Sequence, residues 1–160
     1  MTKEEKQLLL NELCMRLPSK VICRTRKEYS SVVGKAPIEG LLVGVSYDTQ
    51  EVTLACLPLT KRKNYTFPVE EVLPYLRPLS SMTQDEQDEL HDWGFDYHCG
   101  EYGASIQSGQ GLDINDNLSN YTMTYTDAIW LVNWFIKNRF DHNDLYEKGL
   151  SVQPSKKLYK

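Results

Sequence analysis

The chain has 160 residues and a net charge of −4, and 41% of its residues are hydrophobic. This length is typical of one compact domain, and the apolar content is too high for a disordered chain. No apolar run approaches the roughly 18 residues that a membrane-spanning helix requires, and the first residues do not form a secretory signal. We therefore expect a cytoplasmic protein that does not contact the membrane, with its four cysteines as reduced thiols.

Charge is unevenly distributed along the sequence. Residues 1–79 contain twelve Lys and Arg against nine Asp and Glu, whereas residues 80–160 contain six against thirteen. No Lys or Arg occurs between Arg77 and Lys137, a stretch with ten acidic residues. A surface of one sign steers association with a partner of the opposite sign, and the alternative is a solvated acidic surface without a partner.

The first part of the chain, residues 1–79, predicts a helix followed by short strands. Thr2 and Glu5 have the spacing of a capping box, and leucines then recur at helical spacing until Pro18 ends the pattern. The segments that follow are short, rich in β-branched and aromatic residues, and separated by turn signals. This pattern predicts a small curved antiparallel sheet or an SH3-like barrel, with the N-terminal helix over one open face.

The stretch "VEEVLPYLRPLSSMTQDE", residues 69–86, predicts a rigid connector between the strands and the helices. Its first apolar residues are spaced for a single helical turn, and Pro74 and Pro78 prevent that turn from lengthening. Thr83 and Glu86 then form a second capping box that begins a new helix. The prolines and the apolar turn account for this stretch, which is therefore interpreted as structural.

The second part, residues 80–160, predicts an acidic α-helical region. Helices are expected from Thr83 to about Trp93, from Asp127 to Arg139 and from Asn143 to Lys148. Residues 94–125 are rich in Gly, Asn and Asp and predict a long loop with a small hairpin. The predicted fold class is thus α+β, with an N-terminal helix, a small sheet and C-terminal helices in one compact unit.

The sequence predicts no metal site and no cofactor. His91, His98 and Cys99 lack the second pair of close ligands that structural zinc requires. The run that begins at Asp113 resembles the start of a calcium loop, but Leu118 and Thr124 replace its required glycine and glutamate.

Catalysis by Cys99 is the weakest of the functional alternatives. His98 and His91 are the available bases, but adjacent residues rarely direct their side chains at each other, and no motif supports a triad. The protein is therefore predicted not to be an enzyme, with a cysteine-dependent hydrolase as the remote alternative.

Basic residues at strand ends and in one turn of the predicted sheet raise the alternative of a nucleic-acid-binding barrel. The residues concerned are Arg24, Arg26, Lys27, Lys61, Arg62 and Lys63. Small barrels bind nucleic acid through such loops, but the acidic composition of the whole chain argues against it.

Protein binding is the leading functional hypothesis, and two groups of residues are its candidates. The first is an acidic recognition face; the second is a pair of indoles four residues apart, which serve either as core residues or as interface anchors for a homodimer or another protein. The core interpretation of the indoles is favoured, because aromatic side chains usually contribute to the core. The candidate residues are Asp85, Glu86, Asp88, Glu89, Asp92, Trp130 and Trp134.

Three stretches carry a resemblance: "MTKEEKQLLLNELCMRLP", "VEEVLPYLRPLSSMT" and "NWFIKNRFDHNDLYEKGLS". Together they resemble uncharacterised small proteins encoded in phages, prophages and mobile elements of gut Bacteroidetes. The resemblance implies a bacterial cytoplasm and a non-enzymatic binding role, with a host or phage protein as partner. A narrower hypothesis is an inhibitor of a host defence or nucleic-acid-handling protein, engaged by an acidic segment that imitates phosphate charge.

Overall fold

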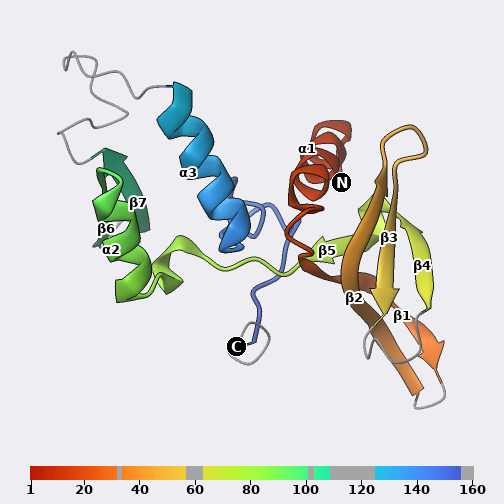
Figure 1. Ribbon diagram of the computed structural model, residues 1–160. Helices are drawn as coiled ribbons and strands as arrows, with labels where there is room; N and C mark the ends of the chain where they lie inside the picture. Colours follow the sequence, from red (N-terminus) through yellow and green to blue (C-terminus); the bar gives the residue numbers. More distant parts are fainter. Residues whose placement is uncertain (32–33, 57–62, 101–102, 109–124, 156–160) are drawn as a thin grey trace. The chain divides into compact units, whose positions relative to one another are not determined.

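The structure is a computed structural model that describes residues 1–31, 34–56, 63–100, 103–108 and 125–155 (Figure 1). The fold is α+β, as predicted. The chain divides into two compact units: unit 1 comprises Met1–Arg77 and Ile136–Lys160, and unit 2 comprises Pro78–Phe135. The sequence had placed residues 136–160 with the acidic helical part, whereas in the structure they belong with the sheet.

Helix α1, Lys3–Arg16, begins unit 1 with the predicted capping box. The Thr2 hydroxyl accepts a hydrogen bond from the Glu5 amide at 3.2 Å, and the Glu5 carboxylate accepts one from the Thr2 amide at 2.7 Å. Leu9, Leu10 and Leu13 are fully buried in a common core with residues of the sheet. Each buried leucine contributes about 1.5–3 kcal/mol, so this apolar face fastens α1 to the sheet.

Five antiparallel strands form the sheet of unit 1, in the order β4-β3-β2-β1-β5. No pairing joins β4 to β5 in the part of the chain that the structure describes, so the sheet is curved and open and does not close into a barrel. The strands are β1 (Ile22–Ser31), β2 (Gly34–Ser46), β3 (Glu51–Cys56), β4 (Asn64–Pro68) and β5 (Val72–Pro74).

Two irregularities in the ladder accompany the curvature of the sheet. The register of β1 on β2 shifts between Arg24 and Glu28, and that of β2 on β3 shifts between Leu42 and Gly44. At the first shift the buried Thr25 hydroxyl accepts from the Ile38 amide at 2.9 Å and donates to the Lys27 carbonyl at 2.8 Å. A side chain thus replaces ladder bonds where the strand bulges, and bulges increase local bending and twist.

The first part of the predicted connector, residues 69–77, belongs to unit 1 and forms a short turn and a strand there. Val69–Glu71 forms a 3₁₀ turn, η2, and the chain then enters β5, which pairs with β1. The apolar residues Val69, Val72, Leu73 and Leu76 are all buried. The helical turn is shorter than the sequence suggested, because Val72 and Leu73 already hydrogen-bond as a strand.

The C-terminal segment returns to the sheet of unit 1 and covers the outer edge of β5. The Leu76 amide donates to the Val152 carbonyl at 2.9 Å, and the Val152 amide donates to the Pro74 carbonyl at 3.0 Å. Further along, the Arg77 amide donates to the Arg139 carbonyl at 2.8 Å. These bonds explain why residues 136–160 belong to unit 1.

The predicted helix over Asn143–Lys148 is wrong, since this segment forms turns. The Asp141 carboxylate accepts from the amides of Leu145, at 2.9 Å, and Tyr146, at 2.7 Å. These amides are four and five residues further on, whereas an N-cap accepts from amides two or three residues further on. Gly149, with φ +66°, ends the segment in a Schellman arrangement, in which the Leu150 amide donates to the Leu145 carbonyl at 2.7 Å. The stop at Gly149 was therefore predicted correctly, but the helix start at Asp141 was not.

Unit 2 contains two helices and a hairpin. A 3₁₀ turn, η3 (Leu79–Ser81), precedes α2 (Gln84–Asp92), and α3 spans Tyr125–Lys137, with its last two residues in unit 1. Strands β6 (Phe95–Gly100) and β7 (Gly103–Ser108) form the hairpin, which falls where the sequence predicted one within residues 94–125.

Helix α2 begins at the predicted second capping box, in which the Thr83 amide donates to the Glu86 carboxylate at 2.8 Å. None of the helices that the structure describes combines the length and apolarity needed to cross a membrane.

Candidate functional site

A stack of aromatic rings organises unit 2. The Trp93 and Trp130 ring centroids are 4.4 Å apart with planes 23° from parallel, and Phe95 lies 5.9 Å from Trp130 with its ring almost parallel. Trp134 continues the series at 6.3 Å from Trp130. Exposure falls steeply along the stack, from 53% for Trp93 to 3% for Trp134. One end of the stack is therefore core, and the other end presents an indole to solvent.

This stack determines which face of α3 is buried. The sequence favoured the indoles as core residues, and Trp134 is buried. Val132 and Ile129 are 37% and 46% exposed. Trp93 and Phe95 supply flat partners for the indoles, and ring stacking adds to the free energy gained by burial.

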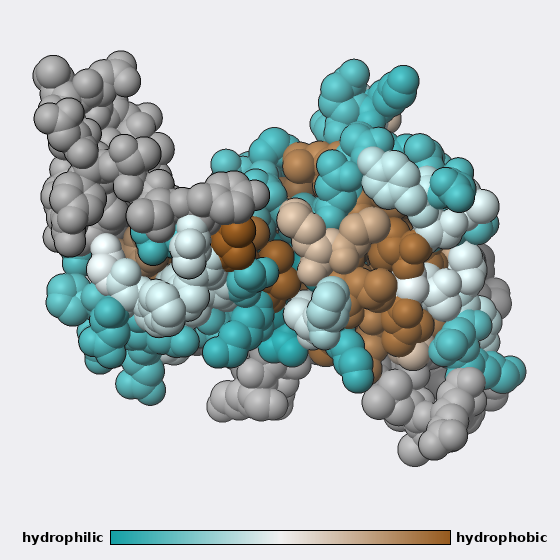
Figure 2. Space-filling view, turned by 45° about the horizontal axis from the view of Figure 1, so that its top comes forward, coloured by the Kyte–Doolittle hydropathy of each residue, from teal (hydrophilic) through white to brown (hydrophobic). Residues whose placement is uncertain are grey.

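The predicted acidic residues lie on α2, immediately before Trp93. Asp85, Asp88, Glu89 and Asp92 occupy one side of this helix, since they are spaced at i, i+3, i+4 and i+7. Asp85, Asp88 and Asp92 are exposed. Glu86 has a different role, because its carboxylate caps the helix. The visible face of unit 2 in Figure 2 is mainly teal and white, the colours of hydrophilic side chains and of residues with intermediate hydropathy.

The charge boundary in the sequence coincides with the structural boundary. Unit 2, Pro78–Phe135, contains ten Asp and Glu and no Lys or Arg, whereas all 18 Lys and Arg of the chain belong to unit 1. The acidic stretch is therefore a separate compact body with a charge of −10. We call the group Asp85, Asp88, Glu89, Asp92 and Trp93 the acidic–aromatic surface.

Two basic residues of the nucleic-acid alternative have partners within unit 1. Lys27 pairs with Glu71, and the Arg26 guanidinium donates to the Gly149 carbonyl at 2.8 Å. Arg24 is half-buried in β1, and Lys63 is exposed before β4. Lys61 and Arg62 lie outside the described residues.

The two thiols whose side chains the structure describes are not activated as nucleophiles. Cys14 and Cys23 are free thiols, and burial raises the pKa of each, which disfavours the reactive thiolate. Cys99 lies in β6, but its side chain is outside the described set. His91 pairs with Asp96 at 3.0 Å, from Nδ1 to Oδ1, in a groove of about 190 Å³. The described lining of that groove contains no Ser, Thr or Cys, and the described residues contain no metal-binding cluster.

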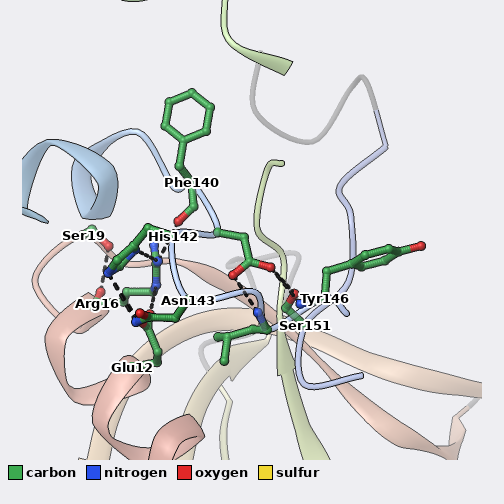
Figure 3. A network of polar contacts seen from close by, with 10 residues as sticks. Glu12, Arg16, Ser19, Phe140, His142, Asn143, Tyr146 and Ser151 are labelled. Carbon is green, nitrogen blue, oxygen red and sulfur yellow. Dashed lines mark hydrogen bonds and ion pairs between the residues drawn. The ribbon is translucent and has the colours of Figure 1, made fainter. Parts of the chain in front are cut away.

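A buried polar network fastens α1 to the C-terminal segment of unit 1 (Figure 3). Glu12 and Arg16 are both fully buried, and Arg16 Nε donates to Glu12 Oε2 at 2.7 Å. Arg16 Nη2 donates to the Phe140 carbonyl at 2.7 Å, and the Asn143 amide donates to Glu12 Oε1. Sequence reasoning missed this network, because Arg16 and Glu12 fit the pattern of an ordinary exposed i, i+4 pair.

His142 borders this network as a neutral imidazole. Arg16 Nη2 lies 3.3 Å from His142 Nδ1, and the amide nitrogen of Asn143 lies 3.3 Å from Nε2. Both neighbours are donors, so a doubly protonated ring would direct an N–H at each of them. Burial is the main cause that lowers the pKa of His142, and Arg16 lowers it further, although Glu12 and Asp141 act in the opposite direction.

We expect the free energy of unfolding to decrease as the pH falls below about 6.5, the ordinary value of a histidine pKa. Because the pKa of His142 is lower in the folded protein, the unfolded chain binds more protons in this window, and stability is fully present only above it. Urea unfolding of wild type and His142→Gln between pH 5 and 8 measures the effect. The variant should lose this part of the pH dependence. His91→Gln, at a side chain that is 76% exposed, should retain it; equal slopes in all three proteins would contradict the assignment.

Comparisons with protein-family models, with curated proteins and with solved structures found no match.

Proposed function

We propose that the protein is a non-enzymatic interaction protein whose unit 2 binds a positively charged surface of another protein. The observation that carries this proposal is the exposed indole of Trp93 beside the acidic side of α2. Trp93 is 53% exposed although a tryptophan normally adds to the core, and it is held in place by its stack on Trp130. A rigid, exposed indole next to carboxylates is suited to a cationic partner.

Charge supports the same class of partner. Unit 2 contains no Lys or Arg, so no basic side chain within the unit is available to pair with Asp85, Asp88 or Asp92. Carboxylates on a compact body of this charge attract a basic partner over a distance of about a Debye length, close to 8–10 Å at physiological ionic strength. This attraction raises the association rate more than the final affinity.

Trp93 supplies the short-range part of recognition. One face of its indole packs on Trp130. Arg or Lys side chains of a partner would stack on the solvent-exposed part of the ring, where a cation–π contact is worth about 0.5–1 kcal/mol at an exposed site. Glu89 and Asp92 precede Trp93 by four residues and one residue, so a cation on the ring would also be close to carboxylates. The surface therefore favours Arg-rich or Lys-rich segments over neutral ones.

In the narrower hypothesis, the partner is a host protein that handles nucleic acid. Such proteins present basic surfaces to phosphates, and a compact acidic body would compete for them. A phage or prophage origin is part of this proposal, and its support is the sequence resemblance described above. Direct nucleic-acid binding is the less favoured alternative, because the chain is acidic overall and Lys27 is paired with Glu71.

Titration with an oligo-arginine peptide tests the proposal through tryptophan fluorescence and calorimetry. We expect saturable binding that weakens steeply with salt, and a loss of affinity of about threefold or more in Trp93→Ala, since one exposed cation–π contact is removed. Replacing Asp85, Asp88 and Asp92 together by Asn should weaken binding further.

Two controls make this result specific. Asp144→Asn removes an exposed carboxylate of unit 1 and should leave binding unchanged. An oligo-glutamate peptide and duplex DNA should not bind to unit 2. If the Trp93 and triple Asn variants bind oligo-arginine as well as wild type does, the acidic–aromatic surface is not the recognition site.

A further inference from the structure

Unit 1 contains an open cleft of about 680 Å³, whereas the surface proposed above belongs to unit 2. It is formed by the start of α1, by β1, by η2 and by the turn that ends at Gly149. Its lining residues are Met1, Glu5, Lys6, Arg26, Glu70, Lys148, Gly149 and Leu150. A cleft of this volume is within the usual range for sites that hold a small molecule.

Both acidic side chains that line the cleft have partners within unit 1. The Glu5 carboxylate accepts from the Thr2 amide as part of the capping box. Glu70 pairs with Lys6 at 2.9 Å, and the hydrogen bond from Lys6 is the main reason that the pKa of Glu70 is lowered. Glu70 is therefore ionised at neutral pH and neutralised by Lys6.

The other two cations of the cleft have neutral partners. Arg26 Nη2 donates to the Gly149 carbonyl at 2.8 Å, and Lys148 Nζ donates to the Asn143 carbonyl at 2.7 Å. Among the contacts of the described residues, neither cation has a carboxylate partner. A carbonyl oxygen orients a cation without cancelling its charge, and a backbone amide likewise leaves the charge of Glu5 in place. The three cations and two carboxylates of the lining therefore leave a net charge of about one positive, with Arg26 and Lys148 free of carboxylate partners among the described residues. Both side chains are exposed and retain further N–H donors.

The position of Arg26 is fixed from two sides. Its backbone belongs to β1, and its guanidinium is held to the turn at Gly149 that also presents Lys148. Gly149 itself is fixed by the Schellman bonds of that turn. Both cations are thus held at the lining of the cleft before any ligand arrives, which lowers the entropic cost of binding.

We propose that this cleft binds a phosphate monoester on a small molecule. A phosphate monoester carries close to two negative charges at neutral pH, which matches Arg26 and Lys148, and the planar guanidinium fork suits phosphate oxygens. Met1 and the buried Leu150 provide apolar wall for the organic part of the ligand. A carboxylate shares the oxyanion chemistry but supplies one charge only.

Calorimetric and NMR titrations with phenyl phosphate, benzoate and phenol test the proposal. We expect saturable binding of phenyl phosphate with a dissociation constant of about 1 mM or below, weaker binding of benzoate and none of phenol. Amide shifts should concentrate at Gly149 and Leu150. Tighter binding of benzoate than of phenyl phosphate, or no saturable binding of either, would overturn the proposal.

Variants locate the site. Lys148→Gln changes an exposed side chain on a turn and should weaken binding of phenyl phosphate by about tenfold, since a charge-assisted contact is lost. Arg26→Gln should weaken it at least as much, and Arg26→Lys less. Lys63→Gln removes an exposed cation outside the cleft and is the matched control. If Lys148→Gln is folded and binds phenyl phosphate as well as Lys63→Gln does, the phosphate is not held in this cleft.

Discussion

Replacement of Arg16 by methionine is expected to lower the free energy of unfolding by about 3–5 kcal/mol, the range for breaking a buried ion pair from one side. Both members of the pair are fully buried, and Arg16 is also the donor to the Phe140 carbonyl. Methionine fills much of the same space but donates nothing. Glu12 would therefore stay inside the protein as a charge, in contact with Asn143 and His142 but without a cation of full charge among the described residues.

Urea unfolding of a matched set of variants separates this effect from general damage to the core. The double variant Glu12→Leu, Arg16→Met should regain a large part of the lost stability, because replacing both partners by apolar residues is often neutral. Glu70→Gln, which breaks the partly exposed pair with Lys6, should cost less than about 1 kcal/mol. A loss in Arg16→Met no larger than in Glu70→Gln would show that the pair does not hold α1 to the C-terminal segment.

The parts of the fold that the sequence predicted correctly are those fixed by local chemistry. Both capping boxes, at Thr2 and at Thr83, form as expected, because a hydroxyl and a carboxylate three residues apart satisfy amides that are neighbours in the chain. The stop at Gly149 was also predicted correctly. The helix start predicted at Asp141 does not form, because its carboxylate binds the amides of Leu145 and Tyr146, four and five residues further on.

What the sequence could not predict depends on contacts between distant segments. The place of residues 136–160 in unit 1 rests on backbone bonds to residues 74–77 and on Arg16, none of which has a local signature. The buried face of α3 depends on distant contacts in the same way. Apolar residues nearly encircle this helix, so periodicity alone does not choose a face, and the stacking partners of Trp130 are Trp93 and Phe95 in other elements.

For the candidate site too, the sequence predicted the local features but not those that depend on distant contacts. Its charge was visible in the sequence, because ten acidic residues without one Lys or Arg are a matter of counting. The sequence pattern identified Trp93 only as the last residue of a helix. Its position four residues after Glu89 and directly before Gly94 could have placed it beside the acidic side of α2. Its exposure, however, follows from which indole enters the core, and that is decided by α3.

Trp134→Ala is expected to destabilise unit 2 by about 3–5 kcal/mol, as truncation of a buried tryptophan does. Trp134 is 3% exposed and contacts Trp130 and Phe135 at ring-centroid distances of 6.3 Å and 5.8 Å. Removing the indole leaves a cavity at the buried end of the stack, which the surrounding rings fill only in part. Trp93→Ala, at the exposed end, should cost only the stacking on Trp130, about 0.5–1.5 kcal/mol.

The comparison of the two variants decides which indole is structural and which belongs to the interaction surface. Near-ultraviolet circular dichroism reports the coupled indoles of Trp93 and Trp130, and its thermal loss follows the melting of unit 2. We expect Trp134→Ala to melt well below wild type, and Trp93→Ala to melt close to wild type while losing affinity for oligo-arginine. The reverse order of melting temperatures would place the exposed end of the stack at Trp134 and leave the acidic side of α2 without its aromatic partner.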